Sequence, residues 1–165
     1  MQSQSRTPLT PFIGTKSPRI LVADQDPVGQ QTLKVQLEKW RCRVEVASSG
    51  AQARAVARKF NPDLILLDVV MPDQSGFAVC EALQADPTTK HIRVIFISAL
   101  SGTPAKVMGF ETGGHDYLTK PFNPGELAAR VGAHLREKYV EDELREKQAK
   151  LTALTDPSSQ QPKDA

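Results

Sequence analysis

The sequence has few cysteines, few aromatic residues and little net charge, and each shortage excludes a class of protein. Its 165 residues include two cysteines, Cys42 and Cys80, which match no metal-binding spacing and are too few for a disulfide-rich scaffold. The formal net charge of +2 gives no general case for nucleic-acid binding, which usually shows as a strongly basic patch. No apolar run approaches the roughly 18 residues needed to span a bilayer. These absences predict a cytoplasmic protein that contacts neither nucleic acid nor membrane directly.

Both ends of the chain are expected to lie outside the folded domain. Residues 1–18 are rich in serine, threonine and proline and lack the apolar stretch of a secretory signal, so we expect a disordered leader. Residues 156–165 (DPSSQQPKDA) predict a flexible tail. The length that remains between the two ends suits one domain.

Between these ends, short apolar runs alternate with longer amphipathic segments. Three runs are dense in branched residues without polar alternation, which is typical of strands buried on both faces of a parallel sheet: Arg19–Ala23, Asp63–Leu67 and Val94–Ser98. Weaker runs at Arg43–Ala47 and Asp116–Thr119 predict two strands nearer the edges of the sheet. Five strand–helix pairs indicate a doubly wound α/β domain over residues 19–136.

Several of the predicted helices have explicit start signals. Asp26, Thr103 and Asn123 each place a capping side chain directly before a proline. Proline suits the first helical position because its missing N–H needs no intrahelical partner there. Ser49 is expected to open the second helix.

Polar and charged side chains follow the predicted strands where each strand ends. Asp24 and Gln25 come after the first strand, Asp68 follows the third, Ser98 ends the fourth, and Lys120 follows the fifth. Ligands of open α/β sheets bind outside the carboxyl ends of the strands, so these residues should gather at one edge. A carboxylate can form an acyl phosphate, and Mg²⁺ typically uses one or two carboxylates with phosphate and water. A lysine and a hydroxyl suit the phosphoryl oxygens. The set therefore predicts phosphoryl transfer.

Four segments, taken in order, resemble the signature segments of response-regulator receiver domains: ILVADQDP, DLILLDVVMPDQSGFAVCEAL, VIFISA and GGHDYLTKPF. The resemblance implies a flavodoxin-like (βα)5 fold, with a five-stranded parallel sheet in the order 2-1-3-4-5 and an extended C-terminal helix. It implies a phosphoacceptor signalling domain rather than an enzyme. The implied partners are a sensor histidine kinase or phosphotransfer protein as donor and an effector protein downstream.

The resemblance also implies roles for the residues at the strand ends. Asp68 is the expected phosphoacceptor. Asp24, Asp68 and the backbone carbonyl of Val70 are the expected Mg²⁺ ligands, and Ser98 and Lys120 are the residues that sense the phosphoryl group.

Two further positions match the family pattern. Tyr117 occupies the position of the family's switch aromatic, which moves inward when the hydroxyl residue shifts. The bond between Lys120 and Pro121 corresponds to one that is usually cis in the family, where it fixes a tight turn.

Gln25 departs from the family pattern, in which a second acid usually binds the metal directly. An amide oxygen can still coordinate Mg²⁺, but a full negative charge is lost, so we expect weaker metal binding and slower phosphorylation. Asp26 either compensates or serves only as a helix cap, the alternative that its place before Pro27 favours. Gln25 also leaves a second hypothesis open: a pseudo-receiver, acting as a phosphorylation-independent interaction or dimerisation module.

Residues 137–155 predict a helical extension of the last helix. Acid–base pairs spaced i,i+4 with the acid first support it. The apolar residues Val140, Leu144, Leu151 and Leu154 fit an alternating 4,3 spacing if Lys147 fills the remaining position of the seam. A short coiled coil, with a homodimer through the helix Ala128–Leu154, therefore stands beside a solvated extension as an alternative. The segment REKQAKLTALTDP resembles the junction between receivers and diguanylate cyclase domains, so the chain is either a stand-alone receiver or the front part of a longer protein.

Overall fold

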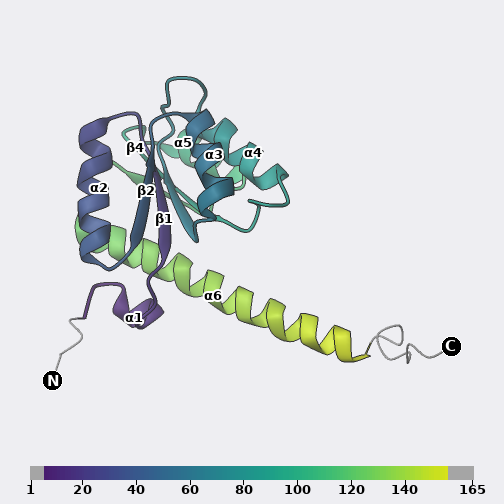
Figure 1. Ribbon diagram of the computed structural model, residues 1–165. Coiled ribbons are helices and arrows are strands. Elements are labelled where there is room, and N and C mark those ends of the chain that lie inside the picture. Colours follow the sequence, from purple (N-terminus) through teal and green to yellow (C-terminus); the bar gives the residue numbers. More distant parts are fainter. Residues whose placement is uncertain (1–5, 156–165) are drawn as a thin grey trace.

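The computed structural model describes residues 6–155 and contains a parallel sheet covered by helices on both faces (Figure 1). Its five strands lie in the order β2-β1-β3-β4-β5. Their bounds are Arg19–Ala23 for β1, Arg43–Ala47 for β2, Leu64–Leu67 for β3, Arg93–Ser98 for β4 and Asp116–Thr119 for β5. The predicted flavodoxin-like order is confirmed. The predicted tail, residues 156–165, lies outside the described residues.

The helices form two layers, one on each face of the sheet. Helices α2 (Pro27–Lys39) and α6 (Pro124–Thr155) cover one face, and α3 (Gly50–Phe60), α4 (Gly76–Ala85) and α5 (Thr103–Glu111) cover the other (Figure 1). Successive strand residues point to opposite faces. In β1, Ile20 and Val22 accordingly pack in the α2–α6 layer, whereas Leu21 and Ala23 pack with α3 and α4. Both faces are buried, which explains the continuous apolar runs in the sequence.

Three of the four predicted helix caps are present. Asp26 Oδ1 accepts a hydrogen bond from Val28 N at 3.1 Å, Ser49 Oγ from Gln52 N at 3.1 Å, and Asn123 Oδ1 from Glu126 N at 2.6 Å. The prediction for Thr103 is wrong. Helix α5 begins at Thr103 itself, after Gly102 in a left-handed conformation with φ of 115°, and no side chain caps it.

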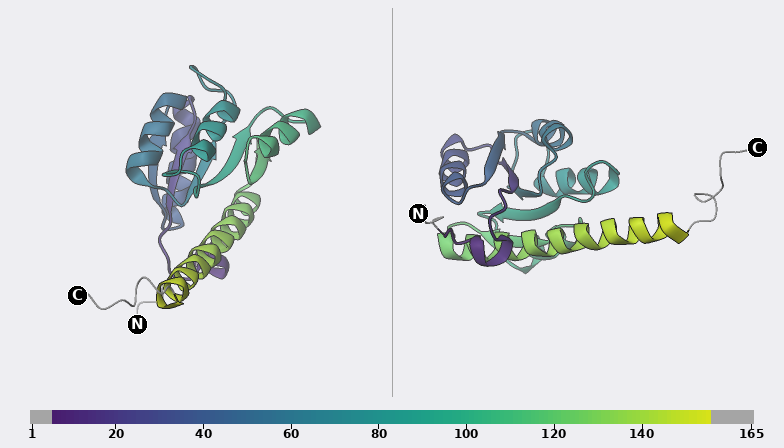
Figure 2. Two further views of the ribbon diagram at one scale, coloured as in Figure 1. Left: turned by 90° about the vertical axis from the view of Figure 1, so that its right-hand side faces the viewer. Right: turned by 60° about the horizontal axis from the view of Figure 1, so that its bottom comes forward.

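Residues 6–18 form an ordered segment, the N-terminal strap, so the expectation of a disordered leader is wrong for these residues. The strap contains the short helix α1 (Thr10–Ile13) and lies beside α6 (Figure 2). Leu9 and Ile13 are buried in the same core cluster as the inner face of α6. The polar composition of this segment did not predict that it packs on the domain. Three apolar residues, Leu9, Phe12 and Ile13, are sufficient to dock it.

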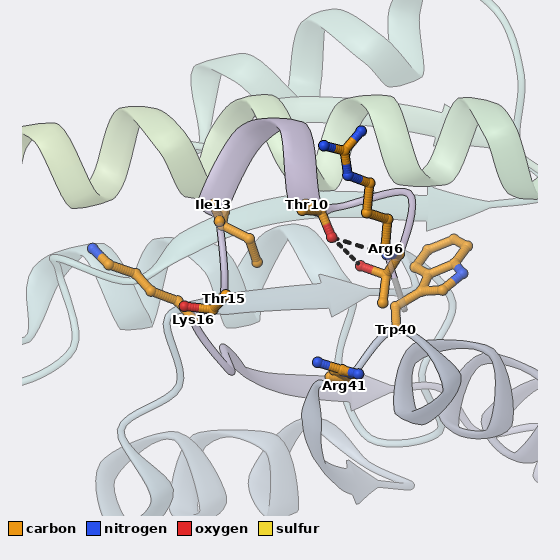
Figure 3. Close-up of a pocket in the computed structure, with 9 residues that line it drawn as sticks. Arg6, Thr10, Ile13, Thr15, Lys16, Trp40 and Arg41 are labelled. Atoms are coloured by element: carbon orange, nitrogen blue, oxygen red, sulfur yellow. Dashed lines mark hydrogen bonds between the residues drawn. The ribbon is translucent and has the colours of Figure 1, made fainter. Parts of the chain in front are cut away.

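A glycine in α6 makes room for the strap. A Cβ at Gly132 would lie 2.3 Å from Cδ2 of Phe12, so a larger residue would displace the ring. Arg136 Nη2 donates to the carbonyl of Pro11 at 2.7 Å, and Lys16 Nζ lies 4.1 Å from the centroid of the Tyr139 ring. A cavity of about 150 Å³ lies under the strap (Figure 3).

Helix α6 continues well beyond the body of the domain as one straight helix (Figures 1 and 2). Its last buried residue is Lys138. The four apolar residues of the predicted 4,3 pattern are all exposed: Val140, Leu144, Leu151 and Leu154. The predicted long C-terminal helix is confirmed. Of the helices described, none combines the length and apolar character needed to cross a membrane.

Candidate phosphoryl-transfer site

The side chain of Lys120 lies between two carboxylates at the carboxyl edge of the sheet. Its Nζ is 2.8 Å from Asp24 Oδ2 and 2.8 Å from Asp68 Oδ2. These residues follow β5, β1 and β3, so three segments that are distant in sequence converge as the parallel strand order predicts. Asp24 is 3% exposed and Asp68 is 9% exposed.

The surroundings of Lys120 favour its charged form. Burial by itself lowers the pKa of Lys120, but the hydrogen bonds from its ammonium group to Asp24 and Asp68 outweigh burial, and the pKa is raised. The lysine therefore stays positive at neutral pH and partly neutralises the two acids. One negative charge remains in excess.

Backbone groups fix the other oxygen of each carboxylate. Asp24 Oδ1 accepts from Asp26 N at 2.9 Å, and Asp68 Oδ1 accepts from Val70 N at 3.0 Å. The buried amide of Gln30 donates to the backbone carbonyl of Asp24 and, at 2.9 Å, to a serine hydroxyl. Gln30 was not predicted from the sequence; its one signal is that it is a polar residue among the buried positions of α2.

The loop after Asp68 is held tightly against two helices. Gly76, the first residue of α4, approaches Asp68 so closely that a Cβ there would lie 2.2 Å from the Asp68 carbonyl oxygen. Asp73 accepts hydrogen bonds from the first two backbone N–H groups of α3, at 2.7 and 2.9 Å, and these bonds lower the pKa of Asp73. The position of Asp68 is therefore set by the packing of α3 and α4 as well as by β3.

Ser98 and Tyr117 lie in one network with Lys120. Ser98 is fully buried, its Oγ accepts from Leu100 N at 3.2 Å, and its carbonyl accepts from Lys120 N at 2.8 Å. The Tyr117 hydroxyl donates to the Leu100 carbonyl at 2.6 Å, and the side chain is turned inward, 5% exposed. Burial raises the pKa of Tyr117, against a hydrogen bond with Ser98 that lowers it. The peptide bond after Lys120 is cis, as expected.

The acidic residues meet the minimum requirement for a hard divalent cation. Asp24 and Asp68 converge, and one or two carboxylates are what Mg²⁺ typically uses in proteins. Gln25 is exposed and Asp26 is engaged as the cap of α2. Within residues 6–155, no group of three or more acidic, histidine or cysteine side chains is placed to hold a metal. Asp24 and Asp68 can therefore hold Mg²⁺. They supply one negative charge fewer than a site with three acidic residues.

The fold and this edge define a doubly wound α/β protein with carboxylates and a lysine at the ends of its strands. The family model of the response regulator receiver domain matches residues 20–132. The chain therefore belongs to the response regulator receiver domain family of two-component signalling.

Individual relatives agree with the family match. The chain is 44% identical over 133 residues to response regulator PleD of Caulobacter vibrioides, covering 81% of this chain and 29% of PleD. It is 42% identical over 119 residues to the DNA-binding dual master transcriptional regulator RpaA of Synechocystis, covering 72% of this chain and 49% of RpaA. The chain thus spans less than half the length of these curated relatives.

Solved structures match the fold over nearly their whole length. A CheY-like receiver domain protein of Methanospirillum hungatei superposes with a TM-score of 0.72 at 25% identity, covering 76% of this chain and 99% of that one. The BeF3-activated receiver domain of RstA from Klebsiella pneumoniae gives a TM-score of 0.68 at 28% identity, covering 72% and 98%.

Proposed function

We propose that this receiver takes a phosphoryl group on Asp68 from the phosphohistidine of a sensor histidine kinase or phosphotransfer protein. The P–N bond of the donor breaks, and a bond forms between phosphorus and a carboxylate oxygen of Asp68. The observation that carries the proposal is the contact of one lysine ammonium with both Asp24 and Asp68 at 2.8 Å. Transfer of this kind depends mainly on positioning and on neutralising charge, which these residues supply.

Mg²⁺ is the cofactor that this site suits. Asp24, Asp68 and the Val70 carbonyl would hold it, with Gln25 as an additional neutral ligand. When bound, the ion would neutralise charge on the phosphoryl oxygens. Because Gln25 carries no charge, we expect a lower Mg²⁺ affinity than in receivers with two adjacent acids.

The Ser98–Tyr117–Lys120 network connects the acceptor to a surface. In the proposed switch, the Ser98 hydroxyl and the Lys120 ammonium bind phosphoryl oxygens, and Tyr117 holds the loop after β4 from the inside. Helix α5, which follows this loop, exposes Val107, Met108 and Phe110. We propose that this α5-β5-α6 face contacts the downstream effector protein, and that the chain acts as a signalling domain without direct contact to nucleic acid.

Phosphoryl uptake is tested by incubating the full chain with acetyl phosphate and Mg²⁺ and measuring its intact mass. We expect one phosphoryl adduct on the wild type, none on Asp68→Asn, and an undiminished adduct on the control Glu143→Gln, which removes an exposed acid of α6 outside the site. The absence of an adduct on the wild type at saturating donor would overturn the proposal.

A second candidate function, the pseudo-receiver, is favoured by Gln25. Its test is the Mg²⁺ affinity of the wild type and of Gln25→Asp, measured by calorimetry. If only Gln25→Asp binds Mg²⁺ at millimolar concentration, the pseudo-receiver is correct. Binding by both proteins, with tighter binding by the variant, supports the phosphorylatable receiver.

The exposed apolar stripe on α6 supports a homodimer through the helix Ala128–Leu154. A second copy packed along this helix would bury the exposed apolar residues Val140, Leu144, Leu151 and Leu154 in a short coiled coil. Sedimentation of the full chain should give a dimer, which the double substitution Leu144→Gln and Leu151→Gln should convert to a monomer. A monomeric wild type at high micromolar concentration would overturn the dimer.

A further inference from the structure

A buried glutamine links the loops that follow β1 and β2. Gln30 lies near the start of α2 and is 6% exposed. Its Nε2 donates to the Asp24 carbonyl and, at 2.9 Å, to Ser48 Oγ, and it lies 3.4 Å from the Ala47 carbonyl. Since Asp24 N already donates to the Ala47 carbonyl at 3.0 Å, Gln30 extends the contact between the two strands beyond their last residues.

These partners leave the amide of Gln30 one orientation. Two of the three oxygens belong to carbonyl groups, which accept hydrogen bonds but cannot donate them, so the nitrogen of the amide must face them. The nitrogen carries two N–H groups, and one is directed at each loop. A polar group is costly to bury unless its hydrogen bonds are made, so removal of the nitrogen would leave both loops without a buried donor.

The bond to the Asp24 carbonyl fixes the peptide group between Asp24 and Gln25. Because a peptide group is planar, holding its oxygen restricts ψ of Asp24 and φ of Gln25 together. These are the acid and the amide that follow β1 at the carboxyl edge, and both are candidate ligands of Mg²⁺. Gln30 presents N–H groups to the loops, and N–H groups do not bind a cation, so it would act on a metal ion only through these two residues.

Through Ser48, Gln30 is also connected to the loop that holds Asp68. Ser48 lies two residues before α3, and its backbone N–H donates to Gln52 Oε1 at 2.7 Å. The first two backbone N–H groups of α3 donate to Asp73, at 2.7 and 2.9 Å, in the loop after Asp68. The loops that carry the two carboxylates of the site are therefore connected by side chains as well as by the sheet.

The start of α2 lies directly against the Asp24 carboxylate. A Cβ at Gly29 would lie 2.8 Å from Asp24 Oδ2, the oxygen that contacts Lys120. The helix backbone and the acid are in close contact here, so a shift of α2 would displace the carboxylate. The anchoring of α2 by Gln30, the next residue, therefore affects the geometry of the site.

We propose that Gln30 is a positioning residue that sets the affinity of the carboxyl edge for a divalent cation. The inference rests on the proposed function only for the role of Asp24 as a ligand, and it does not require phosphoryl uptake by Asp68. Without the amide nitrogen, the peptide group after Asp24 is free to turn, and cation binding must then order it at a cost in affinity. Asp68 keeps its own bonds to Val70 N and Lys120, so the reaction at saturating Mg²⁺ should change little.

The test compares the wild type with Gln30→Met, which keeps the length of the side chain and removes its donor. Calorimetric titration of the full chain with magnesium chloride should show an affinity about tenfold lower, the lower end for residues that orient metal ligands. Ser48→Ala removes one acceptor and leaves the bond to Asp24, so it should lower the affinity about threefold, and it replaces Gln30→Met if that variant does not fold. Gln31→Met is the matched control: the same substitution at the next, exposed position of α2 should leave the affinity unchanged.

Two further measurements distinguish positioning from a purely structural role. With acetyl phosphate as donor, the Mg²⁺ concentration for half-maximal uptake should rise about tenfold in Gln30→Met, whereas the maximal rate should stay within about threefold. Gln25→Asp should improve Mg²⁺ affinity less in Gln30→Met than in the wild type, because both residues depend on one peptide group. A loss of stability in Gln30→Met with unchanged Mg²⁺ affinity would show that the residue is structural only.

The proposal is overturned if Gln30→Met binds Mg²⁺ no more weakly than Gln31→Met, or if Gln25→Asp improves the affinity equally in both backgrounds. If the wild type binds Mg²⁺ too weakly to measure, the same comparison is made in the Gln25→Asp background. Absence of Mg²⁺ binding in both the wild type and Gln25→Asp would also overturn it. Normal Mg²⁺ binding without a phosphoryl adduct would instead refute the proposed function and leave the role of Gln30 intact.

Discussion

At the carboxyl edge of the sheet one ammonium group contacts two carboxylates, whereas at the amino edge one carboxylate contacts a guanidinium group and an imidazole ring. Lys120 contacts Asp24 and Asp68. Asp116, by contrast, contacts Arg130 Nη1 at 2.8 Å and His134 Nε2 at 3.0 Å. Both arrangements are partly buried networks, but the ratio of acidic to basic side chains is reversed. The carboxylates outnumber the basic group at the carboxyl edge, which suits a cation, whereas the single carboxylate of Asp116 is fully occupied by its own protein partners.

Removal of Lys120, the single cation of the carboxyl edge, should have the largest effect of the substitutions considered. In Lys120→Met, two nearly buried carboxylates lose their shared partner, and the phosphoryl oxygens lose a positive group. We expect the rate of phosphoryl uptake to fall about 100-fold, the loss typical of removing one charge-stabilising group. Initial rates with acetyl phosphate measure it, with Lys39→Met as a surface control. Rates within threefold of the wild type would contradict this role for Lys120.

Gly76→Ala tests the packing that positions the acceptor. The added Cβ would meet the Asp68 backbone, which cannot rotate away, at 2.2 Å. We expect a loss of about 3 kcal/mol in the free energy of unfolding, at the upper end for overpacked sites. Urea unfolding measures it. A stability equal to that of the wild type would show that the loop after Asp68 is free to shift.

Asp116→Asn tests the paired acid at the amino edge. Burial raises the pKa of Asp116, but hydrogen bonds from His134, the Tyr117 backbone and Arg130 outweigh it and lower the pKa from 3.8 to about 2. That shift corresponds to about 2 kcal/mol of stability, fully present at neutral pH and lost as pH falls through the folded pKa.

The variant should therefore be about 2 kcal/mol less stable than the wild type at pH 7, and the difference should shrink to roughly half at about pH 3. Urea unfolding across this range checks the prediction. Glu143→Gln, which removes an exposed acid of α6, serves as the control and should show no such pH-dependent difference. A difference independent of pH would contradict an electrostatic origin.

Gly132→Ala should have the smallest effect on stability and sharpens the contrast with Gly76. The new Cβ would meet the ring of Phe12, a side chain of the strap, at 2.3 Å. Loss of that contact is offset by the higher helix propensity of alanine, worth up to about 1 kcal/mol. We expect a change below about 1 kcal/mol in the free energy of unfolding. Faster tryptic cleavage after Lys16 should report release of the strap, and an unchanged cleavage rate would contradict it.

The site at the carboxyl edge could be predicted because it follows from the arrangement of the parallel strands. Once five parallel strands are recognised, the residues after β1, β3 and β5 must meet, and Asp24, Asp68 and Lys120 do so. The cap formed by Asp26 was equally accessible because it depends on two neighbouring residues. Composition misled at the strap, where the spacing of Leu9, Phe12 and Ile13 was a helical signal within a polar segment.

The amino edge could not be predicted because it depends on the path of α6 across the sheet. Nothing in the sequence brings Glu141 to Arg93, or Lys138 to Asp63, since these contacts follow from the angle at which the helix crosses the strands. The support of Asp24 by Gln30 is similarly a tertiary feature. Local rules apply to caps and strand ends, whereas the ion pairs between α6 and the amino edge of the sheet are assembled by packing.

The unbroken length of α6 has a mechanical consequence. From its last buried apolar residue, Leu135, to its end at Thr155, the helix extends about 30 Å, at 1.5 Å per residue. A stiff rod of this length converts rotation into travel, so a tilt of about 10° at the body moves its tip by about 5 Å. A change too small to alter the buried core would then reposition whatever is held at the tip by more than the width of a side chain.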